Sequence, residues 1–327
     1  MKRSYLFALS VMFISVTSML CSCTENGYDE GRNEPMSFTA AISGRTQTRA
    51  TVDTARTAGS TLIVHAAEPS SVAIGSVNKT TRASTPDGVW PNGGANVAVQ
   101  ITGNSNTAQY TIANGKMTSG SPFYWMDKNS VTVTSWYPYS VSMPASWSVK
   151  GDQSTAGATD YAASDLLYAS TPFTYGGSNN TITYTHATAK VVINIVKTND
   201  VTSASSVSSV TIGTASSLID LSGTFNRGAI TATTSTIGYI KPYQTTPADA
   251  TNYVATYSAL VIPQDVSGKQ FIGVTVGANT YYYKPTSLVL QGGNEYDYNV
   301  TISPSTNSPL TPGKYYLLDN GAVSTLP

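Results

Sequence analysis

The sequence predicts an all-β protein that folds as two tandem β-sandwich domains. Stretches in which apolar and polar residues alternate recur along its 327 residues, and this alternation is typical of half-buried strands. Charged residues make up only 11% of the chain, and threonine, serine and tyrosine take their place. Threonine and tyrosine favour pleated, half-buried surfaces. Helical periodicity is nearly absent, and short strands separated by turn signals every 8–12 residues or so favour sandwiches.

Residues 1–22 are expected to be a secretory leader. Lys2 and Arg3 precede an uncharged run, residues 5–20, that is apolar or small throughout. This is the layout of a signal peptide, whereas a transmembrane helix would need about 20 predominantly apolar residues. We therefore expect the chain to be exported and the leader to be removed.

Both cysteines of the chain lie in "LCSC", at the end of this leader. A disulfide between Cys21 and Cys23 would close a strained ring, and two cysteines are too few for a zinc site. "LCSC" resembles a bacterial lipobox, which implies cleavage before Cys23 and attachment of acyl chains such as palmitate to it. Several acyl chains on one cysteine anchor a protein firmly to a membrane.

Residues 23–35 are expected to form an acidic tether that buries nothing. Four acidic residues stand against one basic residue there: Glu25, Asp29, Glu30 and Glu34 against Arg32. Such a tether after a lipid cysteine resembles the surface-export signals of some Gram-negative lipoproteins. It implies a location on the outer face of the outer membrane.

The first predicted sandwich covers residues 36–176. "SFTAAIS", "NVAVQIT" and "VTVTSWYPYS" alternate as strands. Only "SDLLYAS", residues 164–170, has the pattern of a helical turn. Aromatic residues cluster in residues 121–140, between Trp90 and Trp147. Aromatic residues at strand spacing usually fill a core, but an exposed patch that stacks on sugars is the alternative.

The second predicted sandwich covers residues 177–303. We place the junction in the Gly- and Asn-rich "PFTYGGSNNT", residues 172–181. "KVVINIVKT" is apolar on both faces and predicts a strand buried on both sides. "FIGVTVGANTYYYKP" and "SLVLQGGNEYDYNVTIS" predict hairpins that turn at "GAN" and "GGN".

The tail, residues 304–327, has two parts. "PSTNSPLTPG" contains three prolines and no periodicity, so it predicts a linker. "KYYLLDNGAVSTLP" then predicts an apolar strand that has no partner of its own. Such a strand favours pairing with an exposed sheet edge.

The sequence offers little chemistry for catalysis or for nucleic acid. A chain of zero net charge lacks the clustered basic residues that nucleic acid binding requires. The two histidines, His65 and His186, have no carboxylate nearby in the sequence at metal or catalytic-triad spacing, so we assign both a structural role. No nucleotide or calcium motif is present. We expect no catalytic residue, no metal and no cofactor; a secreted glycosidase would need two facing carboxylates.

Several segments together resemble the fimbrillin family, the subunits of type V pili. They are "MSFTAAISGRTQTRAT", "VTVTSWYPYS", "DLLYAST", "ITYTHATAKVVINIV" and "LVLQGGNEYDYNVTIS", in this order over about residues 36–303. The resemblance implies two transthyretin-like β-sandwiches, export as a lipoprotein and assembly into fimbriae with other subunits, as stalk, tip or anchor. It also implies adhesion to host or bacterial surface receptors and no enzyme activity. A sugar-binding surface lipoprotein is the alternative function.

Two expectations concern assembly. Related fimbrillins are trimmed after an arginine beyond the first strand, which implies processing at Arg49, or else at Arg45. Removal of that strand would open a groove. The tail is the expected donor strand for a neighbouring subunit, because backbone hydrogen bonds and alternate side chains supply affinity in strand addition; its residues are Tyr315, Tyr316, Leu317, Leu318 and Val323. Folding back onto its own second domain is the rival role for the tail.

Overall fold

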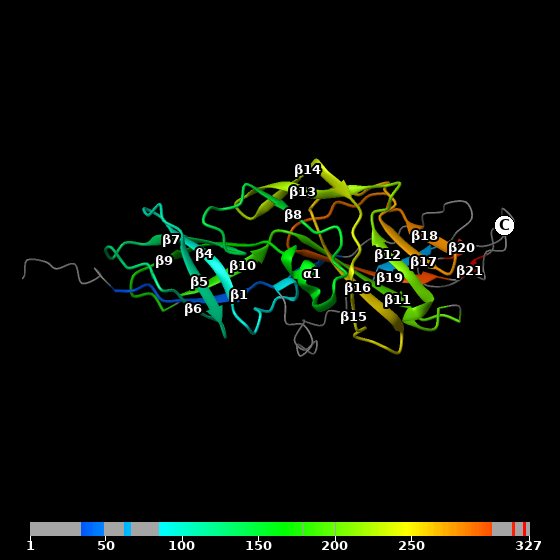
Figure 1. The fold of residues 1–327 in the computed structure, drawn as a ribbon, viewed down its shortest axis with the longest axis horizontal. Coiled ribbons are helices and arrows are strands. Elements are labelled where there is room, and N and C mark those ends of the chain that lie inside the picture. The colour runs from blue at the N-terminus through cyan, green and yellow to red at the C-terminus, as the bar shows by residue number, and fades with distance from the viewer. Residues whose placement is uncertain are drawn as a thin grey trace, which may run out of the picture.

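The regular secondary structure of the described residues is almost entirely β-strand, as predicted (Figure 1). The computed structural model describes residues 34–48, 62–66, 85–178, 180–199, 201–302, 316–317 and 323–324. In this part of the chain the single α-helix is α1 (Thr159–Ala163). The strands gather into one group at each end of an elongated molecule, and α1 lies between the two groups.

The first group is a closed barrel, where the sequence predicted a β-sandwich. Its strands are, in order around the barrel, β1 (Phe38–Ile42), β10 (Thr181–His186), β9 (Leu167–Phe173), β7 (Val131–Tyr137), β4 (Ala95–Ile101), β5 (Ala108–Ala113) and β6 (Lys116–Thr118). Strand β1 closes the ring, because it pairs in parallel with β10 and antiparallel with β6. Closure removes the exposed edges that an open sheet would present.

The barrel core confirms the alternation read from the sequence. Val97, Val99 and Ile101 of β4 are buried. The aromatic cluster is divided between core and surface: Phe123 and Trp136 are buried, whereas Tyr124 is exposed. Phe123 is part of the barrel core, and the half-buried Trp125 and Tyr137 pack against it, as the core interpretation predicted for these three residues.

The second group is organised around β11 (Ala189–Val196), the strand predicted to be buried on both faces. Val191, Val192 and Ile193 are all buried, so side chains of both faces lie inside. Strand β11 pairs antiparallel with β16 (Tyr253–Val261) and parallel with β19 (Asn294–Ile302). The sheet continues to β15 (Tyr243–Thr245) beyond β16, and β19 also pairs with β2 (Thr46–Thr48) and β3 (Leu62–Ala66).

Two three-stranded sheets complete the second core. One contains β12 (Val207–Ile212), β17 (Ile272–Val276) and β18 (Asn279–Tyr283), and β17 and β18 form the hairpin predicted at "GAN". The other contains β14 (Ala229–Gly238), β13 (Ile219–Asn226) and β8 (Ser146–Ser148). Buried side chains of all three sheets form one continuous hydrophobic cluster. At the far end of the molecule, β20 (Tyr316–Leu317) pairs with β21 (Val323–Ser324).

The strand pairing does not follow the division predicted at residues 176 and 177. Strand β10, which we assigned to the second domain, belongs to the barrel, and β11 of the second sheet follows it after two intervening residues. Strands β2, β3 and β8 precede residue 177 but pair with β19 and β13 of the second group. Local periodicity shows that a segment is a strand, but it does not show which sheet the strand joins.

The predicted helical turn at residues 164–170 is wrong. Helix α1 ends before it, Ser164 is its C-cap residue, and β9 begins at Leu167. Pairing with β7 and β10 holds residues 167–173 in extended form, so tertiary contacts override the local pattern there.

A substitution at Phe38 tests whether β1 is part of the packed barrel. Its ring packs edge-on against Tyr110 and Phe173, with ring centroids 5.6 and 5.5 Å apart. Phe38→Ala should lower the free energy of unfolding by about 3–5 kcal/mol, because it leaves a cavity in a packed core. The exposed neighbour Thr39 is the control, and Thr39→Ala should cost roughly 1 kcal/mol or less. Equal urea midpoints for the two variants would contradict this position for β1.

Candidate functional site

The N-terminal segment, residues 34–48, connects the two strand groups. At its beginning the amide of Met36 donates to the carbonyl of Phe123 at 2.8 Å, and β1 then enters the barrel. At its end the amide of Thr46 donates to the carbonyl of Gly293 at 2.9 Å, and β2 joins β19 of the second sheet. A single short stretch of chain therefore completes both groups, and we treat it and its surroundings as the candidate functional site.

Arg45 fixes this segment where it crosses from β1 to β2. Its side chain is 4% exposed, and its Nη2 lies 3.3 Å from Oδ1 of Asp165. The guanidinium also donates to the carbonyl and the hydroxyl of Thr188. Burial lowers the pKa of Arg45 from its ordinary value, and the charge of Asp165 opposes that shift. A buried arginine paired in this way ties the segment to the chain just beyond β10.

Asp165 is the centre of this half of the site. Its Oδ1 lies 3.0 Å from Nδ1 of His186 and accepts a hydrogen bond from the hydroxyl of Thr188. Burial alone would raise the pKa of Asp165, but His186 and Arg45 hold it below the ordinary range. Asp165 lies just after the C-cap residue of α1, and its backbone amide donates to the carbonyl of Ala162. It therefore joins α1, the end of β10 and the N-terminal segment.

A second buried ionic cluster lies beside the first. Nζ of Lys190, on β11, lies 2.9 Å from Oδ1 of Asp87 and 2.9 Å from Oε2 of Glu295. Burial alone would lower the pKa of Lys190, but Tyr161, Glu295 and Asp87 raise it above its ordinary value. Burial likewise raises the pKa of the enclosed Tyr161. Buried charges of this kind are expensive to desolvate and require partners.

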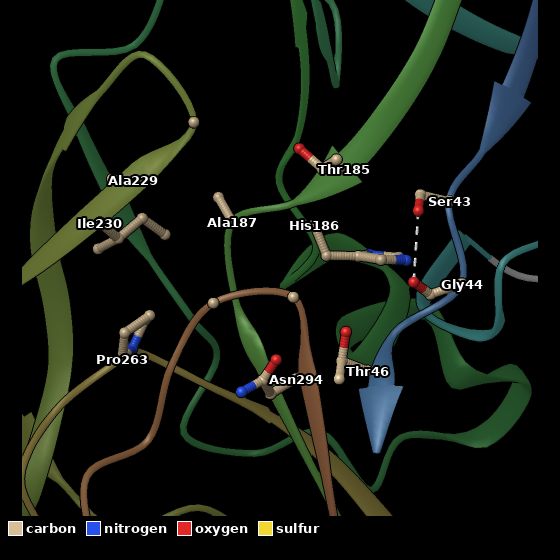
Figure 2. A pocket seen from close by; sticks show the side chains of 13 residues that line it. Ser43, Gly44, Thr46, Thr185, His186, Ala187, Ala229, Ile230, Pro263 and Asn294 are labelled. Atoms are coloured by element: carbon tan, nitrogen blue, oxygen red, sulfur yellow. Dashed lines mark hydrogen bonds between the residues drawn. The ribbon is translucent and has the colours of Figure 1, made fainter. Parts of the chain in front are cut away.

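Beside the segment lies a cavity of about 380 Å³ (Figure 2). Ser43, Gly44 and Thr46 of the segment form one side of it. The other walls come from the end of β10, the β13–β14 turn, Pro263 and residues 292–294. The imidazole of His186 points from β10 toward Gly44. Because the segment itself forms one wall, its removal would widen the cavity into an open groove.

The His186–Asp165 pair resembles the histidine and carboxylate of a catalytic triad only in part. Nδ1 of His186 faces the carboxylate, but Nε2 has no hydrogen-bond partner in the described part of the chain. A triad needs a nucleophile at that nitrogen. Within the same described residues, no group of three or more histidine, cysteine or acidic side chains could hold a metal ion. The geometry favours a structural role for His186.

The sugar-binding alternative would be favoured if Trp90 and Trp125 were exposed in one shared groove, but the two side chains contact different residues. Trp90 packs edge-on against Tyr137 and Tyr184, and Trp125 packs edge-on against Tyr175, with centroids 5.6 Å apart. Neither tryptophan lines the cavity beside the segment. This arrangement does not favour the sugar-binding alternative.

The structure describes only some of the residues singled out in the sequence. Cys23, Arg49, Tyr315 and Leu318 lie outside the described residues. Of the tail, Tyr316 pairs with Ser324 and Leu317 with Val323. Among the helices in the described range, none is long and apolar enough to span a membrane. Lipidation, processing and strand donation remain predictions.

Sequence reasoning missed the two ionic clusters. Asp165 lies 21 residues from His186 in the sequence, and Asp87 lies 103 residues from Lys190, so no local spacing links them. One signal was present: Lys190 interrupts an apolar strand in a chain that is poor in charge. Such a lysine must find a buried counter-ion.

The Asp165 cluster makes a testable contribution to stability. Asp165→Asn should lower the free energy of unfolding by about 3–5 kcal/mol at pH 7, because it leaves Arg45 buried without its counter-charge. The pKa of Asp165 is lower in the folded state than its ordinary value of about 3.9. Its stabilising contribution is therefore present above about pH 4 and is lost as the pH falls through the folded pKa.

Urea unfolding of wild type and Asp165→Asn at several pH values checks this dependence. The difference between the two proteins should shrink as the pH falls below about 4. The matched control is Asp152→Asn, since Asp152 pairs with Lys241 on the surface and should contribute at most about 1 kcal/mol. A difference that stays constant with pH would contradict the assignment.

Comparison with known proteins places this architecture in a family. The profile of the family described as fimbrillin-like matches residues 44–313. A candidate cell adhesion protein from Bacteroides ovatus has a TM-score of 0.54 at 18% identity, over 82% of this chain and 92% of its own. A second one, from Bacteroides uniformis, has a TM-score of 0.51 at 21% identity, over 66% of this chain and 88% of its own.

The two structural matches show that these proteins share a fold with this chain. The match to the family profile shows which family the chain belongs to. No significant match to a curated protein was found. Because the profile covers most of the chain, including both ionic clusters, the protein belongs to the fimbrillin-like family of structural, non-enzymatic proteins.

Proposed function

We propose that the chain is a structural subunit of a cell-surface fimbrium and that subunits join by exchange of a β-strand. The observation that carries the proposal is the double role of the N-terminal segment. It closes the barrel between β6 and β10 and also adds β2 to the edge of β19. Its departure would leave unpaired backbone groups on both strand groups at once, and exposed edges of this kind bind an incoming strand.

Proteolysis is the proposed trigger, and burial favours Arg49 over Arg45 as the site. The guanidinium of Arg45 is enclosed by Asp165 and Thr188, so a protease could reach it only after this cluster had opened. A cut after Arg49 does not itself require this opening, although the contacts of Arg45 must break before residues up to and including β2 can leave. Strand β3, which follows Arg49 in the sequence, would keep its pairing with β19.

The tail is the proposed replacement strand. Residues Tyr316 and Leu317 form a short ladder with Val323 and Ser324. An isolated two-stranded ladder of this length is only marginally stable, so it opens easily. The opened tail would offer backbone donors and acceptors together with tyrosine and leucine side chains to the groove of a neighbouring subunit. Main-chain hydrogen bonds would supply most of the affinity.

Lipidation of Cys23 would anchor the exported chain at the outer membrane before assembly, or permanently if the subunit is the basal one. The acidic tether would keep the folded part at a distance from the lipid. The partners on this proposal are other fimbrial subunits, and receptors on host or bacterial surfaces would be contacted by the assembled fibre.

Processing can be tested in the producing cells. N-terminal sequencing of subunits from isolated fibres should give Ala50 as the first residue, and Arg49→Ala should leave the chain uncut and unpolymerised. Arg56→Ala, a change in the same Arg-rich stretch, should polymerise normally. Fibres in which every subunit begins at Cys23 would remove the processing step from the proposal.

Deletion of residues 314–327 tests strand donation. The shortened subunit should keep its circular dichroism spectrum and melting temperature, because a strand that serves a neighbouring subunit is not needed by the cores of its own chain. It should fail to enter polymers when it is the only subunit supplied. If it polymerises like wild type, or melts several degrees lower, the tail is not the donor.

A further inference from the structure

Lys190 occupies an unusual environment for a lysine. Its side chain is only 2% exposed, and its two acidic partners, Asp87 and Glu295, are 12% and 17% exposed. The pair Lys241–Asp152 provides a contrast in the same molecule, since its atoms are 3.4 Å apart and its side chains are 54% and 51% exposed. The buried amine and both carboxylates are thus held at contact distance with little access to water.

Four separate elements fix this geometry. Lys190 and Glu295 are register partners on the adjacent parallel strands β11 and β19. Asp87 ends the 3₁₀ turn η2 (Thr85–Asp87), which the hydrogen bond from the amide of Gly88 to the carbonyl of Thr85 closes at 2.9 Å. Tyr161 of α1 is fully enclosed beside the lysine. The amine and the carboxyl groups are therefore positioned before any reaction.

We propose that Lys190 and Asp87 become joined by an intramolecular amide bond in the folded protein, with Glu295 as the proton carrier. The nucleophile is Nζ of Lys190 and the electrophile is Cγ of Asp87. No protein or small molecule is needed besides the folded chain, so the step does not depend on the proposed fimbrial function.

The reaction is a condensation in which all atoms are accounted for. The ammonium of Lys190 transfers one proton to Glu295 across their 2.9 Å contact, which leaves a neutral amine. The amine attacks Cγ of Asp87 and forms the C–N bond. One carboxyl oxygen of Asp87 leaves as water, taking the proton held by Glu295 and a second proton from the amine nitrogen. The products are a secondary amide, one water molecule and the regenerated Glu295 carboxylate.

Two physical effects favour the amide. Well-oriented groups react as though present at effective concentrations of about 10⁵–10⁸ M, which offsets the unfavourable condensation of an acid and an amine in water. The reaction also replaces a buried ammonium and a buried carboxylate by a neutral amide, which relieves their desolvation cost. The amine of Lys190 is protonated nearly all of the time, since its pKa is raised. Each chain reacts only once, however, so a small neutral population is sufficient.

The bond would connect the two strand groups. Asp87 precedes β4 of the barrel, and Lys190 belongs to the central strand of the second sheet. A covalent connection across the junction would hold the groups together when the N-terminal segment, their other shared element, is absent.

Intact mass spectrometry of the purified, folded chain tests the proposal. The wild-type mass should be lower than the sequence mass by one water molecule, and a digest should contain one joined peptide with Lys190 and Asp87 cross-linked. Lys190→Arg keeps the positive charge but removes the reactive amine, and Glu295→Gln keeps both reacting groups but removes the proton carrier. Both variants should have the full sequence mass.

Two controls separate the amide from other causes. Asp87 is followed by Gly88, and this pair can lose water by cyclisation to a succinimide. That loss would persist in Lys190→Arg and would overturn the proposal. Lys241→Arg, in the exposed pair, should retain the loss of water seen in wild type. Circular dichroism confirms that each variant is folded, and a full, unmodified mass for folded wild type would also overturn the proposal.

Discussion

The structure depends on one short strand that has to satisfy two neighbours. Strand β1 pairs with β10 on one side and with β6 on the other, and only this double pairing turns the first sheet into a barrel. A sheet with open edges leaves a row of backbone donors and acceptors exposed to other chains. The same stretch of chain continues into β2 and covers part of β19. Both strand groups are therefore complete only while residues 34–48 remain in place.

Burial of charge at the junction follows from this arrangement. A segment that crosses between two cores brings its polar atoms into a region that excludes water, and such atoms require partners. Asp165 meets this requirement for Arg45 and His186, and the pair Asp87 and Glu295 meets it for Lys190. Ionic contacts in this position lock a geometry more than they add net stability, because the cost of desolvation offsets much of the attraction.

These two properties fit a subunit that must be stable as a monomer and still be able to open in a defined place. The barrel slot of β1, the edge of β19 and the cavity beside His186 adjoin the same segment. Loss of that segment would expose all three together, whereas the remaining pairings of β11 with β16 and β19 would be undisturbed. The proposed opening would thus be confined to one segment, and the pairings of the central strand of the second sheet would remain.

The sequence by itself determined the all-β class, the doubly buried strand at residues 189–196 and the hairpin of β17 and β18, because periodicity of two and turn residues are local properties. It also indicated the family, through an ordered series of weak motifs. Local patterns could not show that β10 closes the barrel, that β2 and β3 join the second sheet, or that residues 167–173 are extended. Those features, and the meeting of Asp165 with His186 and of Asp87 with Lys190 across 21 and 103 residues, arise from long-range pairing. Only the tertiary structure decides them, since the hydrogen-bond partners of a strand and the counter-ion of a buried charge are chosen by the whole fold.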